Sequence, residues 1–338
     1  MGGVQPSGGA RARSWGRRLL QARQHRVQAE RSRARGSAVA ESARDQPEAR
    51  ARQGQSGYSE RAVVTSEQDD RAFRALTQKI TRARGLVCDS YKDRCLRRRI
   101  AVRMRARGVH TFDEYGRLLE QDVREYDLLL DALTINVTKF FRNVETWRAL
   151  EPRLTALWTA RHGEVRVWSA GCASGEEPYT VAVALAETAR RLGQETLLSR
   201  ARVDATDIDR TSLERTRAAQ YPEAAFTEMP RELVRRYFSA EVPRRPLPEL
   251  QRIVRVLKHD LTSEPPPAPP YDLVVCRNVV IYFDRRMQER LFSLFADALA
   301  PGGVLLLGKV ETLFGAARAR LVLEEPRERI YRRAEAGA

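Results

Sequence analysis

The sequence predicts an open α/β sheet that follows a small all-helical unit. From about residue 163 onward, short runs of β-type residues alternate with helical stretches, which is typical of parallel strands joined by helices. Between about residues 60 and 145 the apolar residues instead recur three and four positions apart, as they do on one face of an α-helix. With 338 residues, the chain is long enough for both parts.

One of the segments with this helical pattern spans residues 94–108, RCLRRRIAVRMRARG. Its apolar side chains recur every four residues and form one face, while arginines project roughly opposite, at about 100° per residue. The apolar face consists of Leu96, Ile100 and Met104, and the arginines are Arg94, Arg98 and Arg105. Gly108 is expected to end this helix, because glycine favours the left-handed conformation that follows helix C-termini.

Runs typical of buried strands occur in the second part of the chain, and each is followed by a loop. They span residues 165–168, 201–209, 271–278 and 302–309. In an open α/β sheet the ligand binds at the carboxyl ends of the strands, so these loops should form the site. Between about 213 and 262 the alternation is interrupted by a longer segment with short amphipathic pieces, which predicts an inserted subdomain.

The excess positive charge of the chain is confined to its first third. The 60 Lys and Arg residues against 44 Asp and Glu residues give a formal charge of +16, and all of the excess falls before residue 111. Residues 1–58 are rich in Ala, Arg, Gln, Gly and Ser and hold few apolar residues, which predicts a disordered basic tail. Such a tail can bind nucleic acid or an anionic membrane, but a solvated leader is the simpler interpretation.

Composition argues against several classes of protein. No run of about 18 apolar residues occurs, and the basic N-terminal residues are not followed by the apolar region of a signal peptide. The four cysteines show no C-x-x-C spacing. We therefore expect a cytoplasmic protein without membrane insertion, a disulfide framework or a metal site.

The loop after the first strand, WSAGCASGEEPY, leads through small residues into a helix that begins with two acids. Gly171 would let the backbone approach a ligand closely. The loop matches neither a dinucleotide fingerprint nor a phosphate-binding P-loop, and its glutamates would repel phosphate. It suits a cationic or zwitterionic ligand such as S-adenosylmethionine, with Glu176 as the contact. The alternative is that Glu176 only complements the helix dipole.

Polar residues also follow the later strands. Asp207 ends the second strand, where a carboxylate can bind both hydroxyls of a ribose. Asp209 could bind the ribose instead or could cap the helix that follows, so Asp207 is the better candidate. Arg277 and Asn278 end a later strand, with Tyr282 four residues beyond, and should face the same crevice. Upstream of the sheet, the segment LTINVTKFFRN adds Asn136, Thr138 and Arg142.

Together and in order, these segments resemble the chemotaxis-receptor glutamate methyltransferases of the CheR family, over about residues 62–335. The matching strings are LTINVTKFFRN, VRVWSAGCASGEEPYTVA, ATDIDRTSLERTRAAQYPE and YDLVVCRNVVIYFDRRMQERLF. The resemblance implies a Rossmann-like S-adenosylmethionine-dependent methyltransferase domain over residues 146–338, with a small antiparallel β-subdomain inserted at about 213–262. An all-helical N-terminal domain over residues 60–145 would dock the substrate.

The resemblance also implies which residues bind the cofactor. It adds to Gly171 the residues Asn136, Thr138, Arg142, Glu176, Asp207, Asp260, Leu261, Arg277 and Asn278. Glu176 would meet the amino-acid or sulfonium end of the cofactor and Asp207 its ribose. Asp260 stands where the family has an asparagine, and Gly308 to Glu311 keep only the outer residues of a family Gly-His-Ser-Glu string.

The implied reaction transfers the methyl group of S-adenosylmethionine to glutamates of a receptor's cytoplasmic helical bundle, giving γ-methyl esters and S-adenosylhomocysteine without a metal. A glutamate with a pKa of about 4.3 is already ionised near neutral pH, so no general base is required. Tyr282 is the candidate for orienting the acceptor carboxylate or the methyl group, with core packing as an equal alternative. Arg94, Arg98 and Arg105 would dock an acidic receptor helix, unless they form only a solvated face.

Two other functions compete with this hypothesis. A non-catalytic S-adenosylmethionine- or receptor-binding regulator is consistent with the altered string at residues 308–311. A nucleic-acid methyltransferase is suggested by the basic charge and by Pro269-Pro270-Tyr271, which resembles the end of an Asp-Pro-Pro-Tyr motif. That motif, however, belongs after the strand and not before it. We expect a monomer whose partner is the receptor and not nucleic acid.

Overall fold

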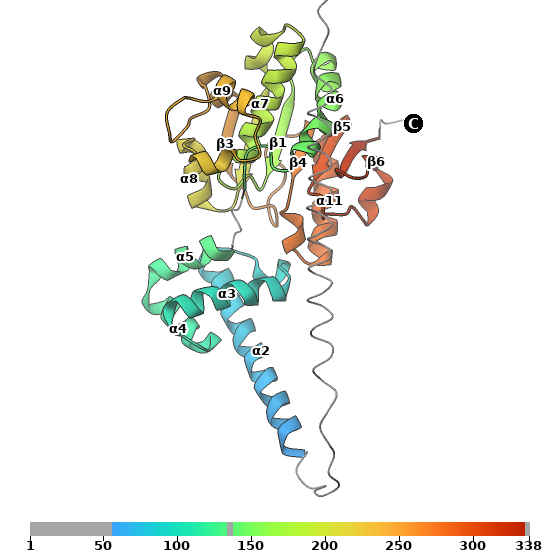
Figure 1. Cartoon of the computed structure of the whole chain (residues 1–338). Helices are drawn as coiled ribbons and strands as arrows, with labels where there is room; N and C mark the ends of the chain where they lie inside the picture. The colour runs from blue at the N-terminus through green and yellow to red at the C-terminus, as the bar shows by residue number, and fades with distance from the viewer. Residues whose placement is uncertain (1–55, 134–137, 335–338) are drawn as a thin grey trace, which may run out of the picture. The chain divides into compact units, whose positions relative to one another are not determined.

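A mixed β-sheet organises the second part of the chain, and helices form the first part (Figure 1). The structure is a computed structural model that describes residues 56–133 and 138–334, with side chains from residue 67 onward. Residues 1–55 of the predicted tail therefore lie outside the described residues, as does Asn136. The described residues from Val64 onward belong to one compact unit, which includes the contacts between helices and sheet reported below.

The helices of the N-terminal unit are α2 (Ser56–Arg84), α3 (Asp93–Arg107), α4 (Phe112–Gln121) and α5 (Val123–Leu133). The apolar face predicted for α3 is buried, and Gly108 ends the helix in the left-handed conformation, with φ at 68°. Thr111 and Glu114 form a capping box that starts α4. α2 begins at Ser56, within the last three residues of the predicted tail.

The strands in the described part of the chain form a seven-stranded sheet in the order β3-β2-β1-β4-β5-β7-β6. They are β1 (Arg166–Ala170), β2 (Arg202–Asp207), β3 (Val254–Lys258), β4 (Tyr271–Cys276), β5 (Leu299–Leu307), β6 (Leu321–Glu325) and β7 (Ile330–Arg333). The first five are parallel to one another, and β7 pairs antiparallel with both β5 and β6. The predicted open α/β sheet is confirmed, and its strand order reverses beside β1.

Helices cover both faces of this sheet. They are α6 (Val144–Ala160), α7 (Glu176–Arg191), α8 (Arg210–Ala218), α9 (Arg231–Tyr237), α10 (Pro248–Ile253) and α11 (Arg285–Ala298). Val167 and Leu306 pack with α6, α7 and α10 on one face, while Trp168 and Leu305 pack with α11 on the other. Burial on both faces explains why the central strands occur as continuous apolar runs in the sequence. None of the helices in the described residues is long and apolar enough to span a membrane.

The inserted segment is shorter and less regular than predicted. β3 begins at Val254 and pairs in parallel with β2, so it belongs to the main sheet and not to the insertion. Between α8 and β3, antiparallel pairing of the described residues is limited to the isolated bridges Tyr221–Arg244 and Phe238–Pro246. The segment is held instead by side chains such as Phe226, which pack into the core of the sheet domain. Its apolar residues therefore serve tertiary packing more than strand pairing.

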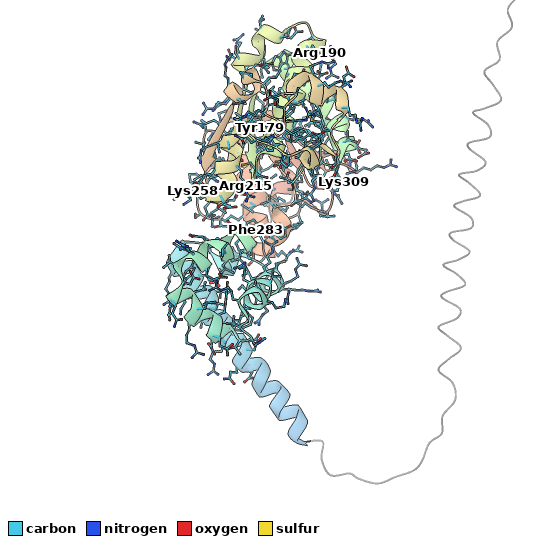
Figure 2. The ribbon with its side chains drawn as sticks, turned by 60° about the vertical axis from the view of Figure 1, so that its left-hand side comes forward. Tyr179, Arg190, Arg215, Lys258, Phe283 and Lys309 are labelled. Atoms are coloured by element: carbon cyan, nitrogen blue, oxygen red, sulfur yellow. The ribbon has the colours of Figure 1, made fainter. Side chains whose placement is uncertain are left out.

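Residues 90–92 and 281–284, which we call the seam, join the helical unit to the sheet domain. Their backbone hydrogen bonds run from Lys92 N to Tyr282 O (3.0 Å) and from Asp284 N to Ser90 O (2.9 Å). Between them, Tyr91 forms an antiparallel bridge with Phe283, which is labelled in Figure 2. The seam connects the residue before α3 directly to the loop after β4.

A buried carboxylate stabilises the helical unit. Glu125 on α5 is fully buried and accepts hydrogen bonds from Arg103 Nε and Nη2 of α3, at 2.9 and 2.8 Å, and from the Tyr115 hydroxyl, at 2.7 Å. Burial opposes ionisation of Glu125, but these donors prevail and hold its pKa below the ordinary value. Loss of the carboxylate would leave the Arg103 guanidinium unpaired in a largely buried place.

We expect Glu125→Ala to lower the free energy of unfolding by about 3–5 kcal/mol, because it leaves the Arg103 guanidinium and the Tyr115 hydroxyl without their acceptor. Glu120→Ala, which removes an exposed carboxylate paired with Lys79, should cost less than about 1 kcal/mol. Urea unfolding followed by circular dichroism measures both changes. Equally small losses would show that the Glu125 network contributes little to stability.

Candidate active site

Two adjoining cavities, among those formed by the described residues, open where β1, β2 and β4 end. The first is the Asp207 cavity, and its sheet-domain lining includes Asp207, His259, Asp260 and Leu261. The second is the Arg277 cavity, and its lining includes Thr138, Arg142, Glu177 and Arg277. Both are bordered by Gly171, Asn278 and Tyr282. The strand order reverses at this point, which is where open α/β sheets bind their ligands.

The loop after β1 packs closely against the loop after β4. Gly171 has φ at +82°, and a Cβ added there would lie 2.6 Å from Val279 Cγ2. The Gly171 N–H donates to Thr206 O at 2.8 Å, which ties the loop to β2. The absent side chain thus makes room for Val279, and the same glycine borders both cavities, where the sequence predicted the close approach of a ligand.

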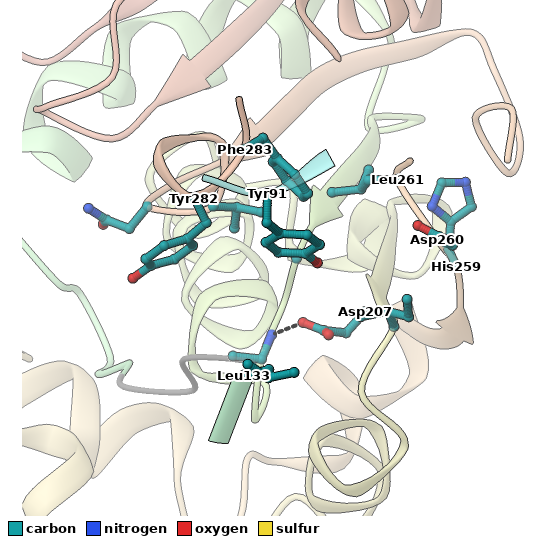
Figure 3. A pocket seen from close by; sticks show the side chains of 13 residues that line it. Tyr91, Leu133, Asp207, His259, Asp260, Leu261, Tyr282 and Phe283 are labelled. Carbon is teal, nitrogen blue, oxygen red and sulfur yellow. Dashed lines mark hydrogen bonds between the residues drawn. The ribbon is translucent and has the colours of Figure 1, made fainter. Parts of the chain in front are cut away.

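Asp207 is fixed at the end of β2 and lines the first cavity (Figure 3). Its Oδ2 accepts a hydrogen bond from Ala173 N and its Oδ1 accepts one from Asp209 N, both at 2.9 Å. Burial raises the pKa of the Asp207 carboxyl, and these backbone donors oppose the rise. A carboxylate held in this way keeps further lone pairs for the hydroxyls of a ligand. Asp209 instead caps α8 by accepting from Thr211 N at 3.0 Å.

The structure places the two glutamates at the start of α7 in different surroundings. Glu176 accepts from Ser174 Oγ at 2.7 Å and lies outside the lining of both cavities. Glu177 lies about 100° further around the helix, lines the Arg277 cavity and accepts from Ser169 Oγ at 2.9 Å. Glu177 is therefore the carboxylate that a cationic group in the cavity would meet. Spacing alone does not separate the two residues, because packing sets the rotation of a helix about its axis.

The Arg277 cavity combines a largely buried acid with a buried cation. Arg277 Nη2 donates to Arg142 O (2.9 Å) and to Asn143 Oδ1 (3.0 Å), and its Nε has no hydrogen-bond partner among the described residues. Burial lowers the pKa of Arg277 and raises the pKa of Glu177 to about 7, while the attraction between the two groups opposes both shifts. A carboxylate and an incompletely paired guanidinium in one cavity fit the ammonium and carboxylate groups of an amino acid.

A buried carboxylate also fixes the loop after β4. Glu311 Oε2 accepts from the N–H groups of Asn278 (3.0 Å) and Gly308 (2.6 Å), and Oε1 accepts from those of Val279 (3.0 Å) and Ile281 (3.3 Å). Asn278 is held at φ 60°, which few residues with a side chain adopt. A Cβ added to Gly308 would lie 2.7 Å from Glu311 Oε2. The two residues kept from the Gly-His-Ser-Glu string are thus the two that hold this loop.

Asp260, which stands in place of the family's asparagine, is engaged in a local turn. Its Oδ1 accepts from Thr262 N at 2.8 Å and from Thr262 Oγ1 at 2.7 Å, and its Oδ2 accepts from Ser263 Oγ at 2.9 Å. The residue nevertheless lines the Asp207 cavity together with Leu261. Since a carboxylate only accepts hydrogen bonds where an asparagine would also donate them, this wall presents acceptors to a ligand.

Tyr282 borders both cavities and contacts an arginine that the sequence analysis missed. Arg99 of α3 is buried, and its guanidinium lies 4.7 Å from the centre of the Tyr282 ring. It donates to Leu133 O, and its Nη2 has no partner among the described residues. The helical periodicity held a signal for it, because Arg99 falls about 60° from Leu96, at the border of the apolar face.

The arginines predicted to dock a substrate are exposed. Arg94, Arg98 and Arg105 have no carboxylate within ion-pair distance in the described part of the chain. Other arginines of α3 are paired inside the helical unit: Arg97 with Asp69 and Asp70, Arg103 with Glu125, and Arg107 with Asp122. The helix therefore separates arginines that stabilise the fold from arginines that remain available to an acidic partner.

Comparison with known proteins finds relatives of both parts of the chain. A family model described as CheR methyltransferase, SAM binding domain, matches residues 136–328, and one described as CheR methyltransferase, all-alpha domain, matches residues 71–134. The chemotaxis protein methyltransferase of Salmonella typhimurium is 35% identical over 257 residues, which are 74% of this chain and 86% of that protein. Those of Escherichia coli and Listeria innocua are 34% and 32% identical, over 72% and 71% of this chain and 84% and 90% of the respective protein.

We expect Glu177→Gln to stabilise the ligand-free protein more at about pH 8 than at about pH 5.5. The folded pKa of about 7 lies above the ordinary value of 4.5, so the folded state favours the protonated acid and loses stability as the pH rises from 4.5 to 7. An amide removes this loss. The gain in the free energy of unfolding should therefore be larger at the higher pH, by up to about 2 kcal/mol in urea titrations.

Glu241→Gln is the matched control for this variant, because Glu241 is exposed. Its effect on stability should be small at both pH values. A gain from Glu177→Gln that is the same at both pH values would contradict the raised pKa of Glu177.

Proposed function

The chain belongs to the CheR family of methyltransferases, and from this premise we propose that it forms γ-methyl esters on glutamates of a chemoreceptor's cytoplasmic helical domain. Its cofactor is S-adenosylmethionine, and the methylation serves chemotaxis. The observation that carries the glutamate proposal is Arg99: an incompletely paired, buried guanidinium beside Tyr282 suits an acceptor that is itself an anion.

The residues of the two cavities fit the polar parts of S-adenosylmethionine. Asp207, already fixed by backbone N–H groups, would accept from the ribose hydroxyls. Glu177 would hold the ammonium group of the amino-acid end, and the free Nε of Arg277 would donate to its carboxylate. Further proposed contacts are Asn136, Thr138, Arg142, Gly171, Asp260, Leu261 and Asn278. When bound, the cofactor supplies an electrophilic methyl group on a sulfonium sulfur.

The remaining task of the protein is to hold the acceptor carboxylate in line with that methyl group. A glutamate is ionised near neutral pH, so no residue has to remove a proton from it. Arg99 would pair with the carboxylate, and the Tyr282 hydroxyl would donate to it, since burial raises the pKa of Tyr282 and keeps the hydroxyl protonated. Orientation of this kind lowers a reaction barrier by up to roughly 7–11 kcal/mol.

The exposed arginines of α3 are proposed to recognise the receptor. Arg94, Arg98 and Arg105 would complement a helix that carries several glutamates, and their main effects would be on the association rate and on the register of docking. The receptor domain lies in the cytoplasm, so the protein would act there, and a monomer suffices for the proposed chemistry.

The competing functions have less support. The altered string at 308–311 suggested a non-catalytic regulator, yet Gly308 and Glu311 still hold the loop that carries Asn278 and Tyr282. A nucleic-acid methyltransferase was suggested by Pro269 and its neighbours, but this segment precedes β4, and the cavities lie at the other end of that strand.

We expect the protein to transfer label from methyl-labelled S-adenosylmethionine to receptor-containing membranes, and the label to be released as methanol on treatment with base. Base-labile label is the property of a carboxyl ester, and label on nucleic acid or base-stable label would contradict the proposal. Arg99→Gln should slow this transfer while leaving the affinity for S-adenosylhomocysteine close to that of the wild type. A loss of cofactor affinity of the same size would argue against a role for Arg99 toward the acceptor.

We expect Arg98→Glu to lower the methylation rate at limiting receptor roughly tenfold, because it replaces an attraction to the acidic helix by a repulsion. The affinity for S-adenosylhomocysteine, measured by calorimetry, should not change. Arg318→Glu reverses another exposed charge, outside the helical unit, and should leave both quantities unchanged. Parallel losses of methylation and cofactor affinity in Arg98→Glu would remove the docking role.

A further inference from the structure

The wall of the Asp207 cavity is built by both parts of the chain. The sheet domain contributes Asp207 and Asp260, while Tyr91 and Leu133 come from the helical unit (Figure 3). A ligand that fills this cavity would therefore contact the helical unit as well as the sheet domain. Of the two helical-unit residues, Tyr91 is the one with a polar group to offer.

The seam holds Tyr91 firmly in this wall. Hydrogen bonds of Ser90 O and Lys92 N to the loop after β4 fix the backbone on either side of it. Lys92 Nζ adds a hydrogen bond to Ile281 O at 2.8 Å. The Tyr91 ring packs against the Phe283 ring with 4.7 Å between centres. The side chain is thus positioned before any ligand arrives, which lowers the entropic cost of using it in binding.

The Tyr91 hydroxyl has no hydrogen-bond partner among the described residues, although acceptors lie near it. Burial raises its pKa, and the carboxylates of Asp260 and Asp207 raise it further, so the hydroxyl remains a donor. Figure 3 shows this hydroxyl directed to the side of the cavity where Asp207 lies. Asp207 accepts from backbone N–H groups and Asp260 from its own turn, and neither receives the tyrosine's proton.

A protonated donor and a fixed carboxylate that share a cavity without bonding to each other suit a ligand hydroxyl between them. A hydroxyl group accepts one hydrogen bond while it donates another, so it satisfies both sides at once. We propose that Tyr91 is a cofactor-binding residue contributed by the helical unit, whose hydroxyl donates to a ribose hydroxyl that in turn donates to Asp207. This inference rests on the proposed assignment of the Asp207 cavity to the ribose.

The consequence is a direct link between cofactor and substrate docking. Tyr91 lies two residues before α3, the helix that carries the exposed arginines, and its seam partners flank Tyr282. A cofactor that bonds to Tyr91 stabilises the seam, and by thermodynamic reciprocity a receptor that stabilises the seam raises the affinity for the cofactor.

The test is Tyr91→Phe, which keeps the ring packing and removes only the hydroxyl. Calorimetry on the full chain should show binding of S-adenosylhomocysteine weakened roughly 3- to 10-fold, the usual effect of one hydrogen bond. The melting temperature of the ligand-free protein should stay unchanged. Tyr126→Phe is the matched control, because Tyr126 is a buried tyrosine of the same unit that lies outside the lining of both cavities.

Analogues of S-adenosylhomocysteine that lack the 2′- or the 3′-hydroxyl identify the contact. For the analogue that lacks the bonded hydroxyl, Tyr91→Phe and wild type should bind equally, whereas the other analogue should keep the difference. Unchanged binding of S-adenosylhomocysteine by Tyr91→Phe, or the same loss with both analogues, would overturn the inference. Failure of the wild type to bind S-adenosylhomocysteine would contradict the assignment of the cavity to the cofactor as well. If the binding results are as expected but the receptor is not labelled, only the glutamate proposal is contradicted.

Discussion

The hydrogen bonds that Glu311 accepts from the backbone of the loop after β4 are the contact on which the site depends. They hold Asn278 in an uncommon conformation and set the path of the chain toward Tyr282 and the seam. Burial raises the pKa of Glu311, and the same backbone donors oppose that rise. One side chain thereby fixes the loop that borders both cavities and leads into the seam.

The arginines of this chain divide by environment into groups with different uses. Arg103 is paired with a buried acid and stabilises the helical unit. Arg99 and Arg277 are buried with one nitrogen unsatisfied, which is costly in a folded protein unless a ligand or substrate completes the pairing. Arg98 is exposed and has no ion-pair partner in the described residues, so it contributes little to stability, and its proposed role is recognition of the receptor. The net charge of the chain does not distinguish these groups of arginines.

Each cavity holds a polar group that a bound ligand would stabilise. Glu177 has a pKa raised to about 7 because burial disfavours its charged form, and the ligand-free protein loses stability when it ionises. A bound ammonium group would favour the ionised form of Glu177, so the attraction between the two charges would contribute to the affinity for the ligand. The tyrosine of the seam follows the same logic, since its hydroxyl is positioned but unsatisfied until a ligand hydroxyl reaches it.

Much of the fold and part of the site follow from local sequence patterns. The parallel strands β1, β2, β4 and β5, the apolar face of α3 and its end at Gly108 arise from backbone periodicity and turn chemistry, which neighbouring residues specify. Position in the sequence favoured Asp207 over Asp209 for the cavity, and the structure shows that Asp209 caps α8. β3 was missed because it is a partly exposed edge strand whose alternation with Arg255 lacks a strong apolar run.

Tertiary structure decided which side chains meet. Whether Glu176 or Glu177 lines the Arg277 cavity depends on how α7 is rotated against the sheet. The contacts of Arg99 with Tyr282 and of Tyr91 with Phe283 join segments that are far apart in the chain. The periodicity of a sequence predicts which face of a helix or strand is apolar. It does not predict which distant element packs against the residues at the edge of that face. That pairing is set by the packing of the helical unit on the loop after β4, where residues of both parts enclose one cavity.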